Sequence, residues 1–505
     1  MVIRISIFWF GILSVICVSC AAPQPQITQS VTLSPASVTL PPYTETPIPS
    51  PTPSVVDPST STPTLNPALV KVLTTTPDFQ KAVNRTPVSP EKCPEINTSI
   101  VPELPKDYIE MPPHYSYSNA ILEYLNAGGS PKVLQNYLSL DSRYWAKKDL
   151  TGDGVPEIVV SFIGHNIFMC EAGQYSNILN LPVEGDPMAS TLLAIQDMNL
   201  DGIPELVFQD EIFSAGVRMY KIYEWDGKEF QSLIWPESEL YAWFSTPKGR
   251  GLKWYDYSAL NNLSPFNEIE GIASNATIKD IDGNGTKEFV VQNQVLPVRH
   301  RGYSPWRATT DIYKWNGVIF LWDQVDIEPP AYRFQAVQDA DRMFLLGNNQ
   351  EALKLYQAVI SENTLYAWSL ENYKQQLDAE GEGSSTPTPI PVIQDEYDNL
   401  AAYAQYRIML LQILQGDPVS AQNTYDTLQK KFPDGTRGYH FTQMATNFWQ
   451  EYQSSRSFGE ACLKVINYAE QHQNDIFAYL GNTEQDISHG TQSHFYIPWD
   501  MCPFE

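Results

Sequence analysis

Short apolar runs recur three times in the middle of the chain, and each follows directly on an acidic segment that contains glycine. The runs cover residues 158–160, 206–208 and 289–291. Their side chains are β-branched, aliphatic or aromatic, the composition of short strands buried on both faces. The sequence therefore predicts three buried strands, each entered from a polar loop.

A second feature follows these strands. Residues 222–230 and 312–320 share the order Ile-Tyr, a charged residue, Trp, and then Asp-Gly or Asn-Gly, while residues 168–175 form a weaker relative. Asp-Gly and Asn-Gly favour tight hairpin turns, and flanking aromatic residues pair well across strands. One repeat is then predicted to contain a polar loop, a buried strand and an aromatic hairpin.

Helical spacing appears on both sides of this β region. Between residues 117 and 140, apolar residues recur every three to four positions, with a break at Gly128 and Gly129. This predicts two short helices that cap the exposed edge of the first β unit. Helical periodicity resumes after Pro329 and Pro330.

The three polar loops share one nine-residue layout. Position 6 is always glycine, which turns without steric cost, and oxygen-bearing side chains occupy positions 1, 3, 5 and 9. Calcium needs about six to eight oxygen ligands, which a short loop supplies by folding back on itself. The predicted ligands, with the carbonyl at position 7, are Asp149, Thr151, Asp153, Val155 and Glu157; Asp197, Asn199, Asp201, Ile203 and Glu205; and Asp280, Asp282, Asn284, Thr286 and Glu288.

A solvated turn is the alternative for any single copy, because Asp-Gly and Asn-Gly are ordinary turn formers. Three copies in one register, each ending in glutamate before an apolar run, favour calcium. The third copy departs most from the pattern. Asn284 replaces the acid at position 5, and Lys287 lies next to position 9.

These motifs resemble the FG-GAP and VCBS repeats of bacterial surface proteins and integrin-type β-propellers, over roughly residues 143–330. The resemblance implies an all-β, small or incomplete propeller-like repeat domain that binds calcium. The first two loops begin 48 residues apart, which fits one four-stranded blade. Residues 233–270 are then either a degenerate blade or an insertion, and their aromatic side chains either stack on sugars or fill a β core.

The helical region resembles tetratricopeptide (TPR) repeats, in which small residues let paired helices approach. The matching residues are Ala340, Gly347, Ala352, Tyr356 and Val359 in a first copy, and Ala421, Tyr425, Leu428 and Pro433 in a second. A third, looser copy runs from residue 441 to 469, with Ala461 at the close-approach position. The predicted fold class is thus multi-domain, an all-β repeat domain plus an α-helical repeat domain, with a plain helical bundle as the alternative.

The chain start resembles a bacterial lipoprotein signal. Arg4 precedes an apolar run over residues 5–16, and Cys20 is the predicted lipidation site. The alternatives are a membrane anchor or an ordinary cleaved secretory signal. The lipid interpretation predicts an extracytoplasmic protein anchored at the cell membrane or outer surface.

Charge and cysteine content narrow the partners and the compartment. With 58 acidic and 32 basic residues the chain carries a net charge of −26, which disfavours nucleic acid as a partner. Beyond the signal remain Cys93, Cys170, Cys462 and Cys502, which allow three pairings outside the cytoplasm. We favour Cys93 with Cys170 and Cys462 with Cys502, because each pair joins an irregular end to the nearest folded unit; buried thiols are the alternative.

These features divide the chain into eight segments. They are a signal (1–19), a disordered tether rich in Pro, Thr and Ser (20–105), a helical cap (106–142), the calcium-loop β domain (143–330), a TPR-like helical hairpin (331–378), a flexible linker (379–396), TPR-like helices (397–481) and an irregular tail (482–505).

Motifs for catalysis are missing from the sequence. It has no HExxH, GxxxxGK, GxSxG or GxGxxG motif, and its seven histidines are scattered. We therefore expect a non-enzymatic, lipid-anchored, calcium-binding protein that binds a protein or glycan partner as an adhesin or scaffold. The alternatives are a secreted polysaccharide hydrolase or lyase that uses the β region as a carbohydrate platform, and a purely architectural spacer.

Overall fold

A computed structural model describes residues 93–104, 114–162, 164–182, 189–212, 217–234, 269–272, 274–295, 305–368, 393–481 and 493–503. They all belong to one compact unit, Pro67–Glu505. Several predictions lie outside the described residues. They concern the signal with Cys20, the tether up to residue 92, most of the aromatic segment 233–270, and the linker up to residue 392.

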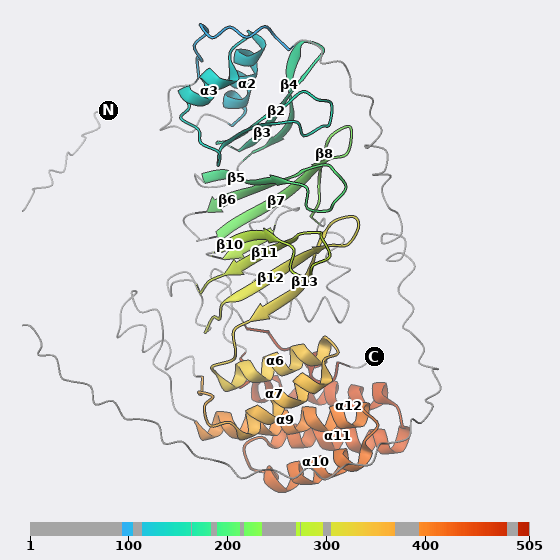
Figure 1. Cartoon of the computed structure of the whole chain (residues 1–505). Coiled ribbons are helices and arrows are strands. Elements are labelled where there is room, and N and C mark those ends of the chain that lie inside the picture. The colour runs from blue at the N-terminus through green and yellow to red at the C-terminus, as the bar shows by residue number, and fades with distance from the viewer. Residues whose placement is uncertain are drawn as a thin grey trace, which may run out of the picture. The chain divides into compact units, whose positions relative to one another are not determined.

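The β region consists of three antiparallel sheets that follow one another along the chain (Figure 1). The first contains β1 (Trp145–Lys148), β2 (Glu157–Ser161), β3 (His165–Glu171) and β4 (Gln174–Leu181). The second contains β5 (Ala189–Gln196), β6 (Glu205–Ile212), β7 (Val217–Trp225) and β8 (Phe230–Ser232), with β9 (Ile269–Ile272) paired to β7. The third contains β10 (Asn275–Lys279), β11 (Glu288–Asn293), β12 (Thr309–Trp315) and β13 (Phe320–Ile327).

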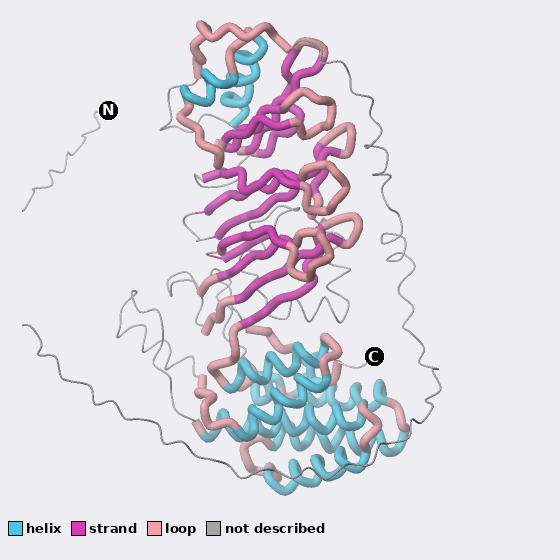
Figure 2. The backbone as a smooth tube through the Cα atoms, viewed as in Figure 1, coloured by secondary structure: helices cyan, strands magenta, loops and turns pink. Residues whose placement is uncertain are grey.

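Each sheet has its four main strands in chain order, and none of the three closes on itself. In such an antiparallel meander, the connection from the first to the second strand lies at the same end as the turn between the third and fourth. The nine-residue loop and the hairpin turn of each repeat are therefore neighbours. Figure 2 shows these connections in pink at the ends of the magenta strands.

In each strand that follows a loop, the three residues after the glutamate are all apolar because both faces of the sheet are covered. Successive side chains of a strand point to opposite faces. Leu206 and Phe208 accordingly share a buried cluster with Val159 and Ile167 of the first sheet. The intervening Val207 packs instead in a cluster with residues of the third sheet. Shared cores therefore join each sheet to the next.

Two helices, α2 (His114–Asn126) and α3 (Pro131–Tyr137), cover the remaining face of the first sheet. Leu125 and Leu134 are fully buried against Ile158 and Phe168. The two helices expected at the sheet edge therefore pack on its face as well. At the edge strand β4, the Asn126 side chain accepts from the backbone N–H of Tyr175 at 2.7 Å and donates to its backbone carbonyl at 3.0 Å.

The helical region begins after β13. Its elements are α6 (Arg333–Leu345), α7 (Asn349–Ser361), α9 (Gln394–Leu414), α10 (Pro418–Lys431), α11 (Tyr439–Ser455), α12 (Phe458–Gln471), α13 (Gln473–Phe477) and the 3₁₀ helix η3 (Pro498–Met501). Helix α9 is central and buried on almost every side. Gly347 and Gly416 adopt positive φ after α6 and α9, a conformation that lets the chain leave a helix sharply.

Small residues sit where these helices approach one another. Ala340, Ala352, Ala421 and Ala461 are all fully buried in one continuous helical core. A larger side chain at these positions would separate the helices. The pattern is the one expected of paired helices, and it accounts for the alanines that the sequence analysis singled out.

No helix among the described residues combines the length and apolar character needed to cross a bilayer.

Candidate metal centre

All three nine-residue loops fold in the same way, around the aspartate at position 1. Its two carboxylate oxygens accept hydrogen bonds from the backbone N–H groups of positions 4 and 6. In the second loop, Asp197 accepts from Leu200 at 2.7 Å and from Gly202 at 3.0 Å. The same pair of bonds forms at Asp149 and at Asp280. The loop therefore curls around its first carboxylate.

Glycine at position 6 is required by the backbone. Gly154, Gly202 and Gly285 have φ values of 86°, 92° and 94°, in the left-handed region. The side chain at position 5 then accepts from the backbone N–H of position 7, at 2.7 to 2.8 Å: Asp153 accepts from Val155, Asp201 from Ile203 and Asn284 from Thr286. A carboxylate has about four lone-pair sites, so these bonds leave acceptor capacity for a cation.

The glutamate at position 9 joins each loop to its strand. Glu157, Glu205 and Glu288 are the first residues of β2, β6 and β11, and all three are buried. One oxygen of each accepts from the backbone N–H of position 2 at 2.7 Å. The prediction that loop and strand begin as one unit therefore matches the described geometry.

The second loop holds carboxylate oxygens that lack a hydrogen-bond partner. Glu205 is fully buried and Glu224, near the end of β7, is 1% exposed. One oxygen of each glutamate has no partner among the described residues. The other oxygen of Glu224 accepts from the amide of Asn199, the residue at position 3, at 2.8 Å. Burying an unpaired carboxylate oxygen is costly, and a cation at this point removes the cost.

The third loop carries a cation of its own. The ammonium group of Lys314, on β12, lies 2.8 Å from the Asp282 carboxylate at position 3. Asp280, Asp282 and Glu288 are close enough together for one oxygen of each to lie within 4.8 Å of the others. Lys287, singled out as a disturbance of this loop, instead donates to the side chain of Gln196 at 3.2 Å.

The first loop is satisfied internally by neutral groups. The Thr151 hydroxyl donates to one oxygen of Glu157 at 3.3 Å, and two backbone N–H groups donate to the other. The residue of the neighbouring strand that corresponds to Glu224 and Lys314 is Met169, which brings neither a carboxylate nor an ammonium group to this loop.

Sheet register explains why the three loops differ. Ile158, Leu206 and Phe289 pair with Phe168, Tyr223 and Tyr313 in neighbouring strands. One step along, the residue opposite the glutamate at position 9 is Met169 in the first sheet, Glu224 in the second and Lys314 in the third. The same place in the repeat is therefore neutral, negative and positive in turn.

The pKa values distinguish the second loop from the third. Burial raises the pKa of Glu205 to about 7, and nearby Asp201 and Asp197 add to the effect. Burial and the neighbouring Asp201 and Glu205 raise the pKa of Glu224 to about 8. In the third loop the hydrogen bond from Lys314 lowers the pKa of Asp282. Negative charge is thus uncompensated in the second loop and compensated in the third.

Two disulfides occur among the described residues. They join Cys93 to Cys170 and Cys462 to Cys502, the two pairings favoured from the sequence. The first ties the segment before α2 to β3, and the second ties the end of the tail to α12. Cys20 lies outside the described residues.

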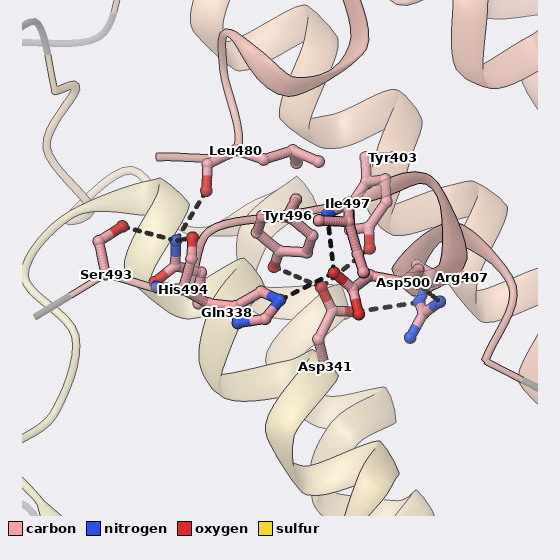
Figure 3. A network of polar contacts seen from close by, with 10 residues as sticks. All are labelled: Gln338, Asp341, Tyr403, Arg407, Leu480, Ser493, His494, Tyr496, Ile497 and Asp500. Carbon is pink, nitrogen blue, oxygen red and sulfur yellow. Dashed lines mark hydrogen bonds and ion pairs between the residues drawn. The ribbon is translucent and has the colours of Figure 1, made fainter. Parts of the chain in front are cut away.

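A buried polar network in the helical region was not predicted (Figure 3). The carboxylate of Asp341 on α6 accepts from the hydroxyls of Tyr356, Tyr403 and Tyr496, and it pairs with Arg407 at 2.9 Å. The partners come from α7, α9 and the tail, so one buried anion holds three helices and the tail together. With both oxygens fully engaged, its role is structural.

A serine, a histidine and an aspartate also meet between the first two sheets, without forming a catalytic triad. Asp210 accepts from Ser190 at 2.6 Å and lies 3.0 Å from His165, so the carboxylate, not the imidazole, stands in the middle. A serine nucleophile needs the histidine as its base. All three are buried, so this cluster has no access to a substrate.

A cleft of about 740 Å³ lies between β13 and the helices α6 and α7. Apolar and charged side chains line it, among them Met343, Leu355, Arg342, Lys354 and Glu351. Arg342 donates to the Val325 carbonyl at 3.0 Å, which fixes it at the wall. Spacing along the chain could not predict this cleft, because its walls lie in separate elements.

No protein-family model matches this chain, and no curated protein matches its sequence.

Proposed function

We propose that this protein binds calcium through its nine-residue loops and that the ions stiffen the β region. The observation that carries the proposal is the pair of buried, unpartnered carboxylate oxygens on Glu205 and Glu224 in the second loop. Oxygen donors of this kind are the ligands calcium prefers. Asp197 and Asp201 supply further carboxylate oxygens in the same loop.

We expect the three loops to differ in calcium affinity. The second loop has the largest uncompensated negative charge and binds calcium most tightly. The first binds more weakly because Thr151 already satisfies Glu157. The third binds weakest because the ammonium of Lys314 neutralises Asp282, which offsets the close approach of its three carboxylates.

Thermal unfolding tests the proposal. Chelation should lower the melting temperature and added calcium should restore it, because an ion that binds only the folded state stabilises it by about 2.7 kcal/mol at a hundredfold excess over Kd. The double variant Asp197→Ala, Asp201→Ala should lose most of this response. An unchanged calcium response in the double variant would contradict the assignment.

At the level of fold, we propose that the sheets are blades of a small or incomplete propeller-like array, and that the helices are TPR-like pairs. The blade interpretation is supported by the four-strand meander repeated three times. The fully buried alanines between paired helices support the second. Cys20 and the signal before it support lipid anchoring at the cell membrane or outer surface.

We further propose an adhesive or scaffolding role, with a protein or glycan as partner. The cleft beside β13 supports this role, since it combines apolar walls with exposed charges such as Lys354. Capture of partners from envelope extract by the full chain, with and without Lys354→Glu, tests the proposal. A bound species that is lost on charge reversal would support the cleft as the site, and capture unchanged by Lys354→Glu would place the partner elsewhere.

A further inference from the structure

A second type of metal-ligand cluster lies in the helical region, far along the chain from the loops. His440 is the second residue of α11, His472 follows the end of α12, and Asp475 belongs to α13. One ligand atom of each lies within 4.8 Å of the other two. His440 is far in sequence from the other two residues, so spacing along the chain did not predict this cluster.

The distances among these groups are those of ligands around a shared ion. The His440 Nε2 atom lies 3.7 Å from Asp475 Oδ2, and His472 Nδ1 lies 4.0 Å from the same oxygen. Both separations are too long for a hydrogen bond. Zinc binds nitrogen and oxygen ligands at about 2.0 to 2.2 Å, so tetrahedral ligands lie roughly 3.3 Å apart. Small side-chain rotations would bring all three into that range.

The surroundings orient the ligands. The Nδ1 atom of His440 lies 2.9 Å from the Tyr468 hydroxyl, which leaves Nε2 directed toward Asp475. The backbone N–H groups of Asp475 and Ile476 both donate to the His472 carbonyl, at 3.1 and 3.0 Å. A metal-bound histidine commonly has its second ring nitrogen held in this way by a neighbouring group.

We propose that His440, His472 and Asp475 form a binding site for a divalent transition metal of the zinc, cobalt, nickel or copper class. Imidazole nitrogen favours these ions, whereas calcium prefers oxygen. Three protein ligands leave coordination positions free, and the Asp475 side chain is 62% exposed, so these positions face solvent. This site is independent of the calcium loops and of their proposed role.

Cobalt absorption tests the site. The full chain, without a histidine tag and with calcium saturating, is titrated with Co²⁺ while the visible d–d bands are recorded, and Zn²⁺ is then added in competition. We expect bands that Zn²⁺ abolishes. His440→Gln, His472→Gln and Asp475→Asn should each weaken binding about tenfold or more, and Tyr468→Phe by up to about tenfold.

The matched control is His494→Gln. His494 lies 3.0 Å from Asp500, in a histidine–aspartate pair without a second histidine among the described residues, and its loss should leave cobalt binding unchanged. Melting temperatures without metal show whether each variant folds. Asp475→Asn should fold normally, because the Asp475 side chain is exposed and its loss disturbs no packing. Absent bands, or bands equally strong in the three ligand variants, would overturn the proposal.

Discussion

Replacing Glu224 by glutamine should affect stability in opposite directions with and without calcium. Glu224 is buried, lies next to Asn199 and Glu205, and has one unpartnered oxygen. Without an ion, the substitution removes a carboxylate that burial and repulsion disfavour, so the metal-free protein should melt at a higher temperature. With an ion, the substitution removes one negative charge from the site, so calcium should stabilise the variant less.

The magnitude follows from Coulomb's law. A unit charge about 5 Å from a divalent ion contributes about 2 kcal/mol at the dielectric constant of water and about 7 kcal/mol at an effective value of about 20. Ionising a carboxyl group of pKa about 8 at pH 7 costs about 1.4 kcal/mol of that gain. Subtracting this cost leaves a net loss between about 0.6 and 5.6 kcal/mol, and we expect a value near the middle, about 2 to 3 kcal/mol, or roughly 30- to 150-fold in Kd.

Calorimetric titration with calcium measures Kd, and a thermal melt in chelator measures the metal-free stability. The matched control is Glu229→Gln, which removes the same charge from an exposed position in the same hairpin. Its Kd and its melting temperature should both stay close to those of the unchanged protein. Equal calcium binding by Glu224→Gln and the control would show that Glu224 does not take part in the site. A metal-free Glu224→Gln protein less stable than the control would show that the buried carboxylate is not a cost.

Three further predictions follow from the same contacts. Lys314→Met should raise the calcium affinity of the third loop in a titration, whereas Lys279→Met in the same sheet should not. Metal-free protein should lose stability as pH rises through about 7. The pKa values of Glu157 and Glu205 are raised to about 7 in the folded state, so the folded protein holds protons there that favour folding only at lower pH. Melts with calcium should lack most of this loss. Asp341→Asn should cost about 3 to 5 kcal/mol in denaturant unfolding, because Arg407 is left buried without its counter-ion.

Local sequence carried enough information to predict the loops and the strands that follow them. Gly202 needs a left-handed backbone, and the side chain of Asp197 accepts from Leu200 and Gly202 of its own loop, so these features depend on neighbours a few residues away. The buried alanines of the helical pairs and the two cysteine pairings were also accessible, since they rest on helical periodicity and on the order of segments along the chain.

The differences among the loops could not be read from spacing. Glu224 reaches Asn199 and Lys314 reaches Asp282 across 25 and 32 residues, and only strand register decides that they occupy equivalent places. The Asp341 network depends likewise on tertiary packing, since its partner Tyr496 lies 155 residues away. The charged residue before each hairpin tryptophan was visible in the sequence, but only the strand register shows that it lies opposite the glutamate of the loop.

The most direct test of the central claim is a crystal structure of the protein grown with calcium, with the ion located by its anomalous scattering. We expect an ion in the second loop, within about 2.3 to 2.6 Å of carboxylate oxygens from Asp197, Asp201 and at least one of the two buried glutamates. Density for ordered loops with no ion at this position would contradict it.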